Sequence, residues 1–281
     1  MSESKVWFIT GTSSGFGRNL AEEVLAKGGR VVATARKPEV LADLVGKYPE
    51  TVRAVKLDVT NPEDVKNSIR EAVEQFGRID VLVNNAGYVL VGAIEESSEE
   101  QIRRQFDTNL FGVLNVTREA LPILREQKSG HIVNIGSVVG ISAVPSMGIY
   151  SATKFALEGL SEALAGELAP FGIKTMIVEP GPFSTDGFAN AVFAEDSLQG
   201  VYPSSAQLDE TFQEFKNIAG DTVKAVKIII EAVESDDPPF RLPLGLPAFE
   251  AIEAKLEQVK QEISVWRTRA INTNFDAAAN A

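Results

Sequence analysis

Up to residue 178, short runs of β-branched residues alternate with helix-length amphipathic stretches, and this alternation constrains the fold more than any other feature. Strands are expected over residues 6–10, 31–35, 52–57, 81–83, 132–135 and 174–178. Helices are expected between them, over residues 18–27, 62–76, 98–126 and 151–168. Repeated strand–helix–strand units place their strands side by side in parallel. The sequence therefore predicts the α/β fold class, with one doubly wound parallel sheet and helices on both faces.

The pattern changes over residues 182–221, where aromatic residues are scattered without a strand-like period: Phe183, Phe188, Phe193, Tyr202, Phe212 and Phe215. Irregular segments of this length are either functional or mobile. We interpret this one as a helical lid over a substrate cleft, and the alternative is a surface insertion with a small core of its own. Beyond it, helices are expected over residues 222–235 and 248–268, with a proline-rich extended crossing at 242–247.

Composition excludes several kinds of site. The 281 residues include no cysteine and one histidine, which excludes disulfides, a cysteine nucleophile and thiolate or multi-histidine metal sites, so no metal is expected. The formal net charge of −12 opposes nucleic-acid binding, because phosphate backbones are held by clustered Lys and Arg. No apolar run approaches the ~20 residues that span a bilayer. We therefore expect a cytoplasmic protein without a membrane span.

A glycine-rich turn directly follows the first expected strand and leads into the first helix. Its residues include Gly11, Ser13, Ser14, Gly15, Phe16 and Gly17. Glycines let a backbone turn sharply and approach a pyrophosphate, whose charge is met by the free N–H groups of a helix N-terminus. Between a strand and a helix, such a turn favours a nucleotide cofactor over a merely tight connection.

The end of the second expected strand indicates which cofactor is bound. An acidic residue there bonds the ribose 2′-hydroxyl of NAD, whereas a basic residue receives the 2′-phosphate of NADP. Arg36 occupies this place. We infer NADP(H), and the alternative is an arginine that is simply solvated beside Lys37.

Four polar residues on successive units form a candidate catalytic set. Tyr150 and Lys154 are four residues apart and share a helix face. A nearby ammonium group lowers the pKa of a phenol, so Tyr150 is expected to act as general acid and base. Ser137 follows a strand and is placed to bond the substrate oxygen. Asn109, unusual inside a helix, is expected to perturb the backbone bonding and to hold a water for proton relay.

These motifs resemble those of the classical short-chain dehydrogenase/reductase family, whose fold is Rossmann-like. The resemblance covers residues 6–185 and rests on the glycine-rich turn, on the Asn-Asn-Ala-Gly stretch at 84–87, on the four catalytic candidates and on Pro180-Gly181 with Thr185. It implies that Asp58 meets the adenine with Val59 beside it, that Asn85, Ala86 and Gly87 border the ribose, that Lys154 bonds the nicotinamide ribose, and that Pro180, Gly181, Phe183 and Thr185 hold the carboxamide end. The resemblance also places Tyr150 beside the nicotinamide end of the cofactor. The longer C-terminal portion resembles the branch that contains 17β-hydroxysteroid and retinol dehydrogenases.

The resemblance gives the chain one domain over residues 1–281: a cofactor-binding and catalytic core at 5–181, the lid at 182–221 and C-terminal helices with an extension at 222–281. The expected activity is NADP(H)-dependent interconversion of a carbonyl, preferably apolar, and an alcohol. Two alternatives remain open: the same fold acting as an epimerase, dehydratase or C=C or C=N reductase, or a regulator that senses NADP(H) without catalysis. The family also implies a homodimer or homotetramer.

Overall fold

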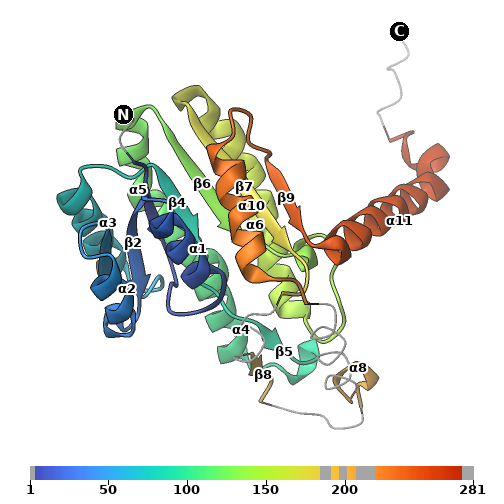
Figure 1. Ribbon diagram of the computed structural model, residues 1–281. Coiled ribbons are helices and arrows are strands. Elements are labelled where there is room, and N and C mark those ends of the chain that lie inside the picture. The colour runs from blue at the N-terminus through green and yellow to red at the C-terminus, as the bar shows by residue number, and fades with distance from the viewer. Residues whose placement is uncertain (1–3, 184–190, 196–200, 207–218, 274–281) are drawn as a thin grey trace, which may run out of the picture.

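A seven-stranded sheet forms the centre of the computed structural model, which describes residues 4–183, 191–195, 201–206 and 219–273 (Figure 1). Its strands are β1 (Val6–Ile9), β2 (Arg30–Ala35), β3 (Val52–Lys56), β4 (Val81–Asn84), β6 (Gly130–Ile135), β7 (Ile173–Pro180) and β9 (Arg241–Leu244). The spatial order is β3-β2-β1-β4-β6-β7-β9, and every neighbouring pair is parallel. The predicted doubly wound parallel sheet is confirmed.

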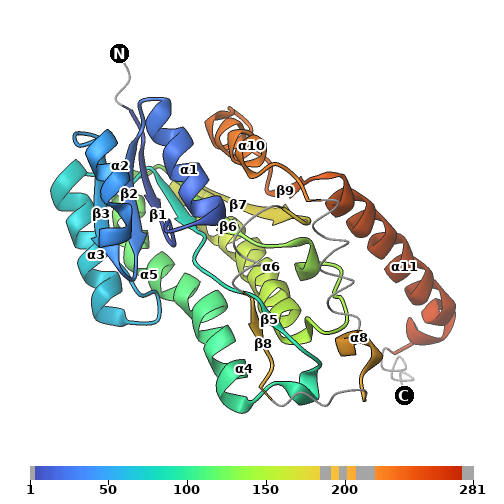
Figure 2. The same ribbon diagram turned by 60° about the horizontal axis from the view of Figure 1, so that its bottom comes forward.

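Helices cover both faces of the sheet (Figure 2). The main ones are α1 (Gly15–Ala26), α2 (Ala42–Lys47), α3 (Pro62–Phe76), α4 (Glu99–Phe106), α5 (Gly112–Gln127), α6 (Gly148–Leu168), α10 (Thr222–Glu234) and α11 (Leu246–Ala270). Strand β1 shows how two cores arise from one strand. Its Trp7 and Ile9 pack with α1, α2 and α10, whereas Val6 and Phe8 pack with α3, α5 and α6, because successive side chains of a strand point to opposite faces.

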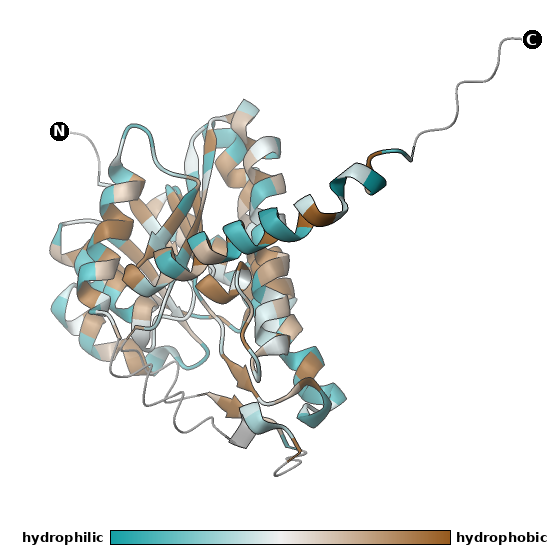
Figure 3. Cartoon of the chain, turned by 90° about the vertical axis from the view of Figure 1, so that its right-hand side faces the viewer, coloured by the Kyte–Doolittle hydropathy of each residue, from teal (hydrophilic) through white to brown (hydrophobic). Residues whose placement is uncertain are grey.

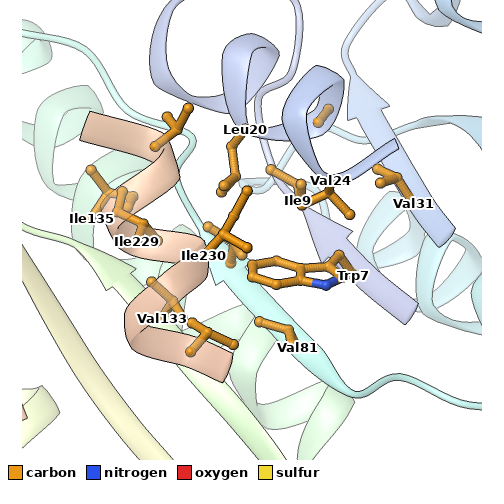
Figure 4. Packing of buried hydrophobic residues seen from close by; sticks show 14 of the residues in the cluster. Trp7, Ile9, Leu20, Val24, Val31, Val81, Val133, Ile135, Ile229 and Ile230 are labelled. Atoms are coloured by element: carbon orange, nitrogen blue, oxygen red, sulfur yellow. The ribbon is translucent and has the colours of Figure 1, made fainter. Parts of the chain in front are cut away.

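The core beneath α1 and α10 joins the N-terminal and C-terminal parts of the chain (Figure 4). Ile229 and Ile230 of α10 pack beside Leu20 and Val24 of α1 over Trp7, and all five side chains are buried. Burying an aliphatic side chain of this size contributes about 1.5–3 kcal/mol. The segment that follows the catalytic motifs is therefore part of the main fold.

Helix α3 has the bounds that the sequence predicts, and its ends show why. The Asn61 side chain accepts hydrogen bonds from the N–H groups of Glu63 and Asp64, and Pro62 occupies the first helical position. Gly77 ends the helix with φ of 74°, a left-handed conformation that favours glycine.

Two expectations about secondary structure are wrong. The expected continuous helix at 98–126 is divided into α4 and α5 by a π-helical segment, Asp107–Phe111. The expected extended crossing at 242–247 is instead β9 followed directly by the start of α11. Strand β9 pairs with β7 at the edge of the sheet, where prolines such as Pro243 are tolerated because one side of the strand has no partner.

The described part of the expected lid is not helical over most of its length. Strand β8 (Val192–Phe193) pairs with β5 (Leu90–Val91) in a small second sheet, which lies beyond the carboxyl edge of the main sheet at the bottom of Figure 1. Within the described residues of this segment, one short helix, α8 (Pro203–Ala206), follows. Phe188, Phe212 and Phe215 lie outside the described residues. Among the helices described, none is both long and apolar enough to cross a membrane.

Candidate active site

The candidate site lies at the carboxyl edge of the sheet, where β1 and β4 are neighbours. The chain leaves β1 toward β2 and β3 on one side, and it continues from β4 toward β6 and β7 on the other. Such a reversal of strand order opens a crevice at the carboxyl ends of the strands, and ligands of doubly wound sheets bind there. The glycine-rich turn, the 84–87 stretch and Ser137 all follow strands that end at this edge.

The glycine-rich turn needs glycine at particular positions. Gly11 and Gly15 have φ of 70° and 59°, in the left-handed region that side chains disfavour. A Cβ at Gly17 would lie 2.4 Å from both the Gly11 carbonyl oxygen and Asn85 Nδ2. Helix α1 begins at Gly15, with Ser13 and Ser14 on the turn before it, and neither a side-chain cap nor an acidic residue occupies its first turn. Its N-terminal N–H groups therefore remain suited to an anionic ligand.

Hydrogen bonds tie this turn to the 84–87 stretch. The Thr10 hydroxyl oxygen accepts from the backbone N–H groups of Asn85 and Ala86 at 2.8 and 2.9 Å. Asn85 Nδ2 donates to the carbonyl oxygens of Thr10 and Gly11 at 2.8 and 2.9 Å. The Asn85 side chain thus fixes the turn, which the sequence interpretation missed when it placed Asn85 only beside the ribose.

Asn84, the first residue of the 84–87 stretch, belongs to a buried polar network. Its Nδ2 donates to Asn134 Oδ1 at 2.8 Å and to the Thr117 hydroxyl at 3.0 Å, and Asn134 Nδ2 donates to the Ser161 hydroxyl at 2.9 Å. The network links β4 and β6 to α5 and α6. It holds the two strands that carry the 84–87 stretch and Ser137 in register.

Arg36, Asp58 and Val59, which the sequence interpretation assigns to the adenosine end of a cofactor, lie beyond the carboxyl ends of β2 and β3. Arg36 follows β2 and is exposed, whereas Val59 is buried with its carbonyl oxygen bonded by Asn115. Burial raises the pKa of Asp58, but hydrogen bonds from Thr60 and the positive charge of Arg36 outweigh it, so the pKa is lowered. Arg36 and Asp58 are therefore close enough for the charge of one to act on the other.

Ser137, Tyr150 and Lys154 come together as predicted. Tyr150 and Lys154 lie one turn apart near the start of α6, with Lys154 Nζ 5.7 Å from the Tyr150 ring centroid. The Ser137 hydroxyl, which also accepts from the Val139 N–H, is hydrogen-bonded to Tyr150. Lys154 is buried and donates from Nζ to the Ile135 carbonyl oxygen at 2.7 Å.

The expected pKa of Tyr150 is wrong. Burial raises it to about 12, and the hydrogen bond with Ser137 offsets this only in part. Lys154 is not among the causes of this shift, and its ammonium is hydrogen-bonded to the Ile135 carbonyl oxygen. Burial lowers the pKa of Lys154 itself to about 8, although the negative charge of Glu158 acts in the opposite direction.

Asn109 lies buried in the π-helical segment between α4 and α5, so its expected effect on the helix is confirmed. Its Oδ1 accepts from the Tyr88 N–H at 3.1 Å, and its Nδ2 donates to the Tyr88 carbonyl oxygen at 2.9 Å and to the Thr153 hydroxyl at 3.5 Å. A Cβ at Gly87 would lie 3.1 Å from the same Oδ1. Asn109 therefore connects the 84–87 stretch to the helix that carries Tyr150.

The segment after β7 closes the candidate site beside the glycine-rich turn. Pro180 ends β7, and Gly181 donates its N–H to the Leu244 carbonyl oxygen. The Phe183 ring packs edge-on against Phe16 with centroids 5.3 Å apart, and Gly220 lies so close that a Cβ there would be 2.5 Å from the ring. Phe183 thus belongs to the core and not to the wall of a substrate pocket, which corrects that part of the lid interpretation. Thr185 lies outside the described residues.

A buried charged cluster beside Lys154 was missed by the sequence interpretation. Arg241 of β9 forms ion pairs with Glu158 of α6, with Glu179 of β7 at 2.8 Å and with the more exposed Glu162. Burial, and then the charge of Glu179, raise the pKa of Glu158 to about 7, although Arg241 acts against both. Glu158 lies four residues after Lys154, on the same helix face. That spacing was the one feature of the sequence that indicated a charged group beside Lys154.

The raised pKa of Glu158 predicts a pH-dependent stability. Between its ordinary pKa of 4.5 and about 7, the folded protein holds a proton on Glu158 that the unfolded chain has released. The free energy of unfolding contributed by this group therefore falls as the pH rises through this window. The glutamine of Glu158→Gln stays neutral at every pH. The melting temperature of this variant should therefore rise relative to that of the wild type as the pH increases from 4.5 to 7.5.

The matched control is Glu162→Gln, which removes an exposed carboxylate from the same Arg241. Its melting temperature should follow that of the wild type across the pH range, since exposed ion pairs contribute little. Melting temperatures of the wild type and Glu158→Gln that change in parallel with pH would show that folding does not raise the pKa of Glu158.

Comparisons with known proteins agree with this architecture. Residues 5–196 match the short chain dehydrogenase family. An oxidoreductase of Botryotinia fuckeliana is 38% identical over 94% of this chain and 97% of its own length. A 3-ketodihydrosphingosine reductase of Bacteroides thetaiotaomicron is 38% identical over 90% and 92%. The crystal structure of a short-chain dehydrogenase from Streptomyces avermitilis superimposes with a TM-score of 0.88, 42% identity and coverage of 96% and 100%.

Two further solved structures, each 29% identical, contain cofactors. A short chain dehydrogenase/reductase from Burkholderia phymatum in complex with NAD has a TM-score of 0.80 and covers 94% of this chain and 95% of its own. A short chain dehydrogenase from Burkholderia cenocepacia in complex with NADP has a TM-score of 0.73, with 94% and 97% covered. The fold, the family match and these relatives together place the chain in the short-chain dehydrogenase/reductase family of oxidoreductases.

Proposed function

We propose that this protein interconverts a ketone or aldehyde and the corresponding alcohol, with NADP(H) as the cofactor and Tyr150 as the general acid and base. The observation that carries the proposal is the cluster of Ser137, Tyr150 and Lys154 at the carboxyl edge of the sheet, joined through Asn109 to the stretch that holds the glycine-rich turn. A regulator without catalysis has no physical need for this set.

The residues of the turn fit a dinucleotide. Gly17 lets the turn pack closely against Asn85 and the Gly11 carbonyl oxygen, and the N-terminus of α1 offers N–H groups to a pyrophosphate. When bound, NADPH supplies the hydride that reduces the carbonyl carbon. Thr185, which the resemblance assigns to the carboxamide, is part of the proposal only through that resemblance.

The protein's own part in reduction is to hold the substrate oxygen and to protonate it. The Ser137 hydroxyl donates a hydrogen bond to this oxygen, and Tyr150 transfers its phenolic proton to it as the C–H bond forms. A pKa of about 12 keeps Tyr150 protonated at neutral pH, which suits the reductive direction. Asn109 is proposed to hold the water through which the proton is replaced.

An apolar environment beside Tyr150 supports an apolar substrate. Val89, Val91 and Met147 are buried in a small cluster against which Val144, Ala191 and Tyr150 pack. The 3-ketodihydrosphingosine reductase among the relatives is named for a keto substrate. We therefore place bulky apolar ketones ahead of small polar carbonyls.

The reaction class is tested by assaying purified protein against a panel of carbonyls and following NADPH absorbance. Oxidation of NADPH with at least one ketone, fastest for bulky apolar members, is the expected result. If no carbonyl supports NADPH oxidation while NADPH still binds, the epimerase, dehydratase and regulator alternatives replace this proposal.

Arg36→Asp should reverse the cofactor preference. Charge-assisted hydrogen bonds to a 2′-phosphate contribute about 1.5–3 kcal/mol each, and every 1.4 kcal/mol is about tenfold, so the wild type should prefer NADPH by at least about tenfold. The aspartate repels the phosphate and offers a partner to the ribose hydroxyls of NADH. The measurement is kcat/KM for both cofactors with one ketone.

Lys37 adjoins Arg36 and is also exposed, so the same ratio should be measured in Lys37→Ala and in the double variant. If the double variant had the same ratio of kcat/KM for NADPH and NADH as the wild type, Arg36 would be only a solvated residue.

The proposal extends to assembly and location. Phe111 of the π-helical segment and Phe155 of α6 are exposed, which supports a homodimer or homotetramer through the helices that begin near Ser98 and Ser151. The cytoplasmic location expected from the sequence is part of the same proposal.

A further inference from the structure

Helix α11 projects away from the body of the protein (Figure 3). Its first turn is anchored, since Ala248 is buried and its backbone nitrogen packs close to Gly181. From Leu256 to the end of the helix at Ala270, however, every residue is exposed. Isolated helices shorter than ~12–15 residues are marginally stable in water. An overhang of this length therefore indicates that something packs against it.

The apolar residues of α11 follow a heptad pattern. They recur alternately three and four residues apart: Phe249, Ile252, Leu256, Val259, Ile263 and Trp266. All but Ile252, which is half-buried, are exposed. A repeat of this kind places one narrow stripe along a helix and is typical of two helices that wind around each other. A stripe this narrow favours another helix as the partner.

We propose that α11 is a dimerisation helix, and that it pairs in antiparallel orientation with α11 of a second copy of this chain. In the alignment that we propose, Phe249 faces Trp266 of the second copy, Ile252 faces Ile263, and Leu256 faces Val259. The two-fold symmetry repeats each contact. All six residues of the stripe are then covered. A pair shifted by one heptad does not achieve this, since a shift toward the C-terminus leaves Phe249 and Ile252 unpaired and the opposite shift leaves Ile263 and Trp266 unpaired.

The charges that flank the stripe select this alignment. It brings Glu253 beside Lys260 of the second copy and Lys255 beside Glu262, so that both flanks carry opposite charges. A shift of one heptad toward the C-terminus would instead set Lys255 beside Arg269 and Glu262 beside its own symmetry mate. The opposite shift would set Glu253 and Lys255 each beside its own symmetry mate. A parallel pair would set Lys255 beside Lys260. Within α11, Lys260 forms an exposed ion pair with Glu257 at 3.4 Å. Exposed pairs of this kind contribute little, so this one does not prevent Lys260 from pairing with Glu253 of the second copy.

The same charges argue against a membrane surface as the partner. Helix α11 contains four acidic residues, Glu250, Glu253, Glu257 and Glu262, and four basic residues, Lys255, Lys260, Arg267 and Arg269. Its net charge is therefore zero, whereas helices that lie on anionic membranes carry an excess of Lys and Arg on their polar face.

Two valines of α11 provide a matched test. Val259 belongs to the stripe, whereas Val265, which is 77% exposed, lies on the opposite side of the helix. Sedimentation equilibrium of the full chain should show Val259→Glu associating at least about tenfold more weakly than the wild type, because a carboxylate would be buried without a partner. Val265→Glu should match the wild type. Equal masses for all three proteins would overturn the proposal, whatever their enzymatic activity.

Orientation is tested by charge exchange. Glu253→Lys and Lys260→Glu should each weaken association, because each places like charges opposite one another, and the double variant should restore it. Failure of the double variant to recover would overturn the antiparallel alignment.

The chain contains no cysteine. A disulfide between two introduced cysteines therefore shows directly which residues of the two copies lie side by side. Under oxidation, a mixture of Phe249→Cys and Trp266→Cys chains should form a mixed disulfide dimer, whereas Phe249→Cys alone should not cross-link. Cross-linking of Phe249→Cys alone would indicate a parallel pair. Binding of the wild type to phosphatidylglycerol vesicles that Val259→Glu loses, with no change in mass, would assign the stripe to lipid instead. Either result would overturn the proposal.

Discussion

Replacing Tyr150 by Phe is expected to lower kcat for ketone reduction by about 10²–10⁴-fold, the usual contribution of general acid–base catalysis. The substitution removes only the phenolic hydroxyl, so the ring keeps its packing against Met147 and the cluster around it. The dissociation constant for NADPH should change little, because the glycine-rich turn and Arg36 are untouched. Steady-state kinetics should therefore show a large loss of turnover, while fluorescence titration of NADPH should show nearly unchanged cofactor binding.

Tyr48→Phe is the matched control, since it makes the same chemical change at a residue that packs beside the core under α1 and α2. It should retain the turnover of the wild type. A Tyr150→Phe protein that also retains it would exclude Tyr150 as the proton donor and would leave Ser137 as the remaining hydroxyl in the cluster. Alcohol oxidation requires the phenolate, and the pKa of Tyr150 is about 12. Oxidation should therefore accelerate with rising pH as long as the pH stays below about 8, where Lys154 keeps its ammonium.

The sheet was predictable because each strand and its helix carry their own pattern. In β1, Trp7 and Ile9 alternate with Val6 and Phe8 between two cores, and α3 has its capping signals at both ends. Strand β9 had no such pattern, since Pro243 interrupts a short run that becomes a strand only by pairing with β7. Edge strands that depend on a distant partner cannot be recognised from local sequence.

The catalytic residues were predictable for a different reason. Tyr150 and Lys154 are close in sequence, so helical spacing alone brings them together. Asn109 indicated a local irregularity, but the π-helical segment depends on its hydrogen bonds to Tyr88, twenty-one residues away.

The electrostatics of the site could not be predicted in the same way. The cluster of Glu158, Glu179 and Arg241 joins residues up to 83 positions apart, and the pKa values of Tyr150 and Lys154 are set mainly by how deeply the fold buries them. Burial is a property of the whole packed structure, and a spacing pattern indicates which groups meet but not how much solvent they lose.

Lys154→Met is expected to weaken both cofactor binding and turnover. Lys154 is proposed to bond the ribose of the bound cofactor, and in the structure its Nζ already lies buried at the Ile135 carbonyl oxygen. Methionine has nearly the same shape but neither a charge nor a donor. Loss of a hydrogen bond from a charged group typically costs about 1.5–3 kcal/mol, which corresponds to roughly ten- to hundredfold in the dissociation constant for NADPH.

The pH dependence of the wild type distinguishes this role from simple structural damage. Burial lowers the pKa of Lys154 to about 8, so the ammonium is present below that pH and is lost as the pH rises through it. Since kcat/KM reports the ionisations of the free enzyme, kcat/KM for NADPH should fall above pH 8 in the wild type. The fall should be absent in Lys154→Met, whose kcat/KM is low at every pH.

Lys174→Met is the control for this pH profile. Lys174 is an exposed lysine at the start of β7, the end of the strand away from the candidate site, where it bonds the Asp236 carbonyl oxygen. It should keep both the affinity for NADPH and the fall above pH 8. If the Lys154→Met protein kept that fall, the titrating group would be another residue. Lys154 would then act only through its hydrogen bond to Ile135, which positions the first turns of α6 against the end of β6 and so places Tyr150 beside Ser137.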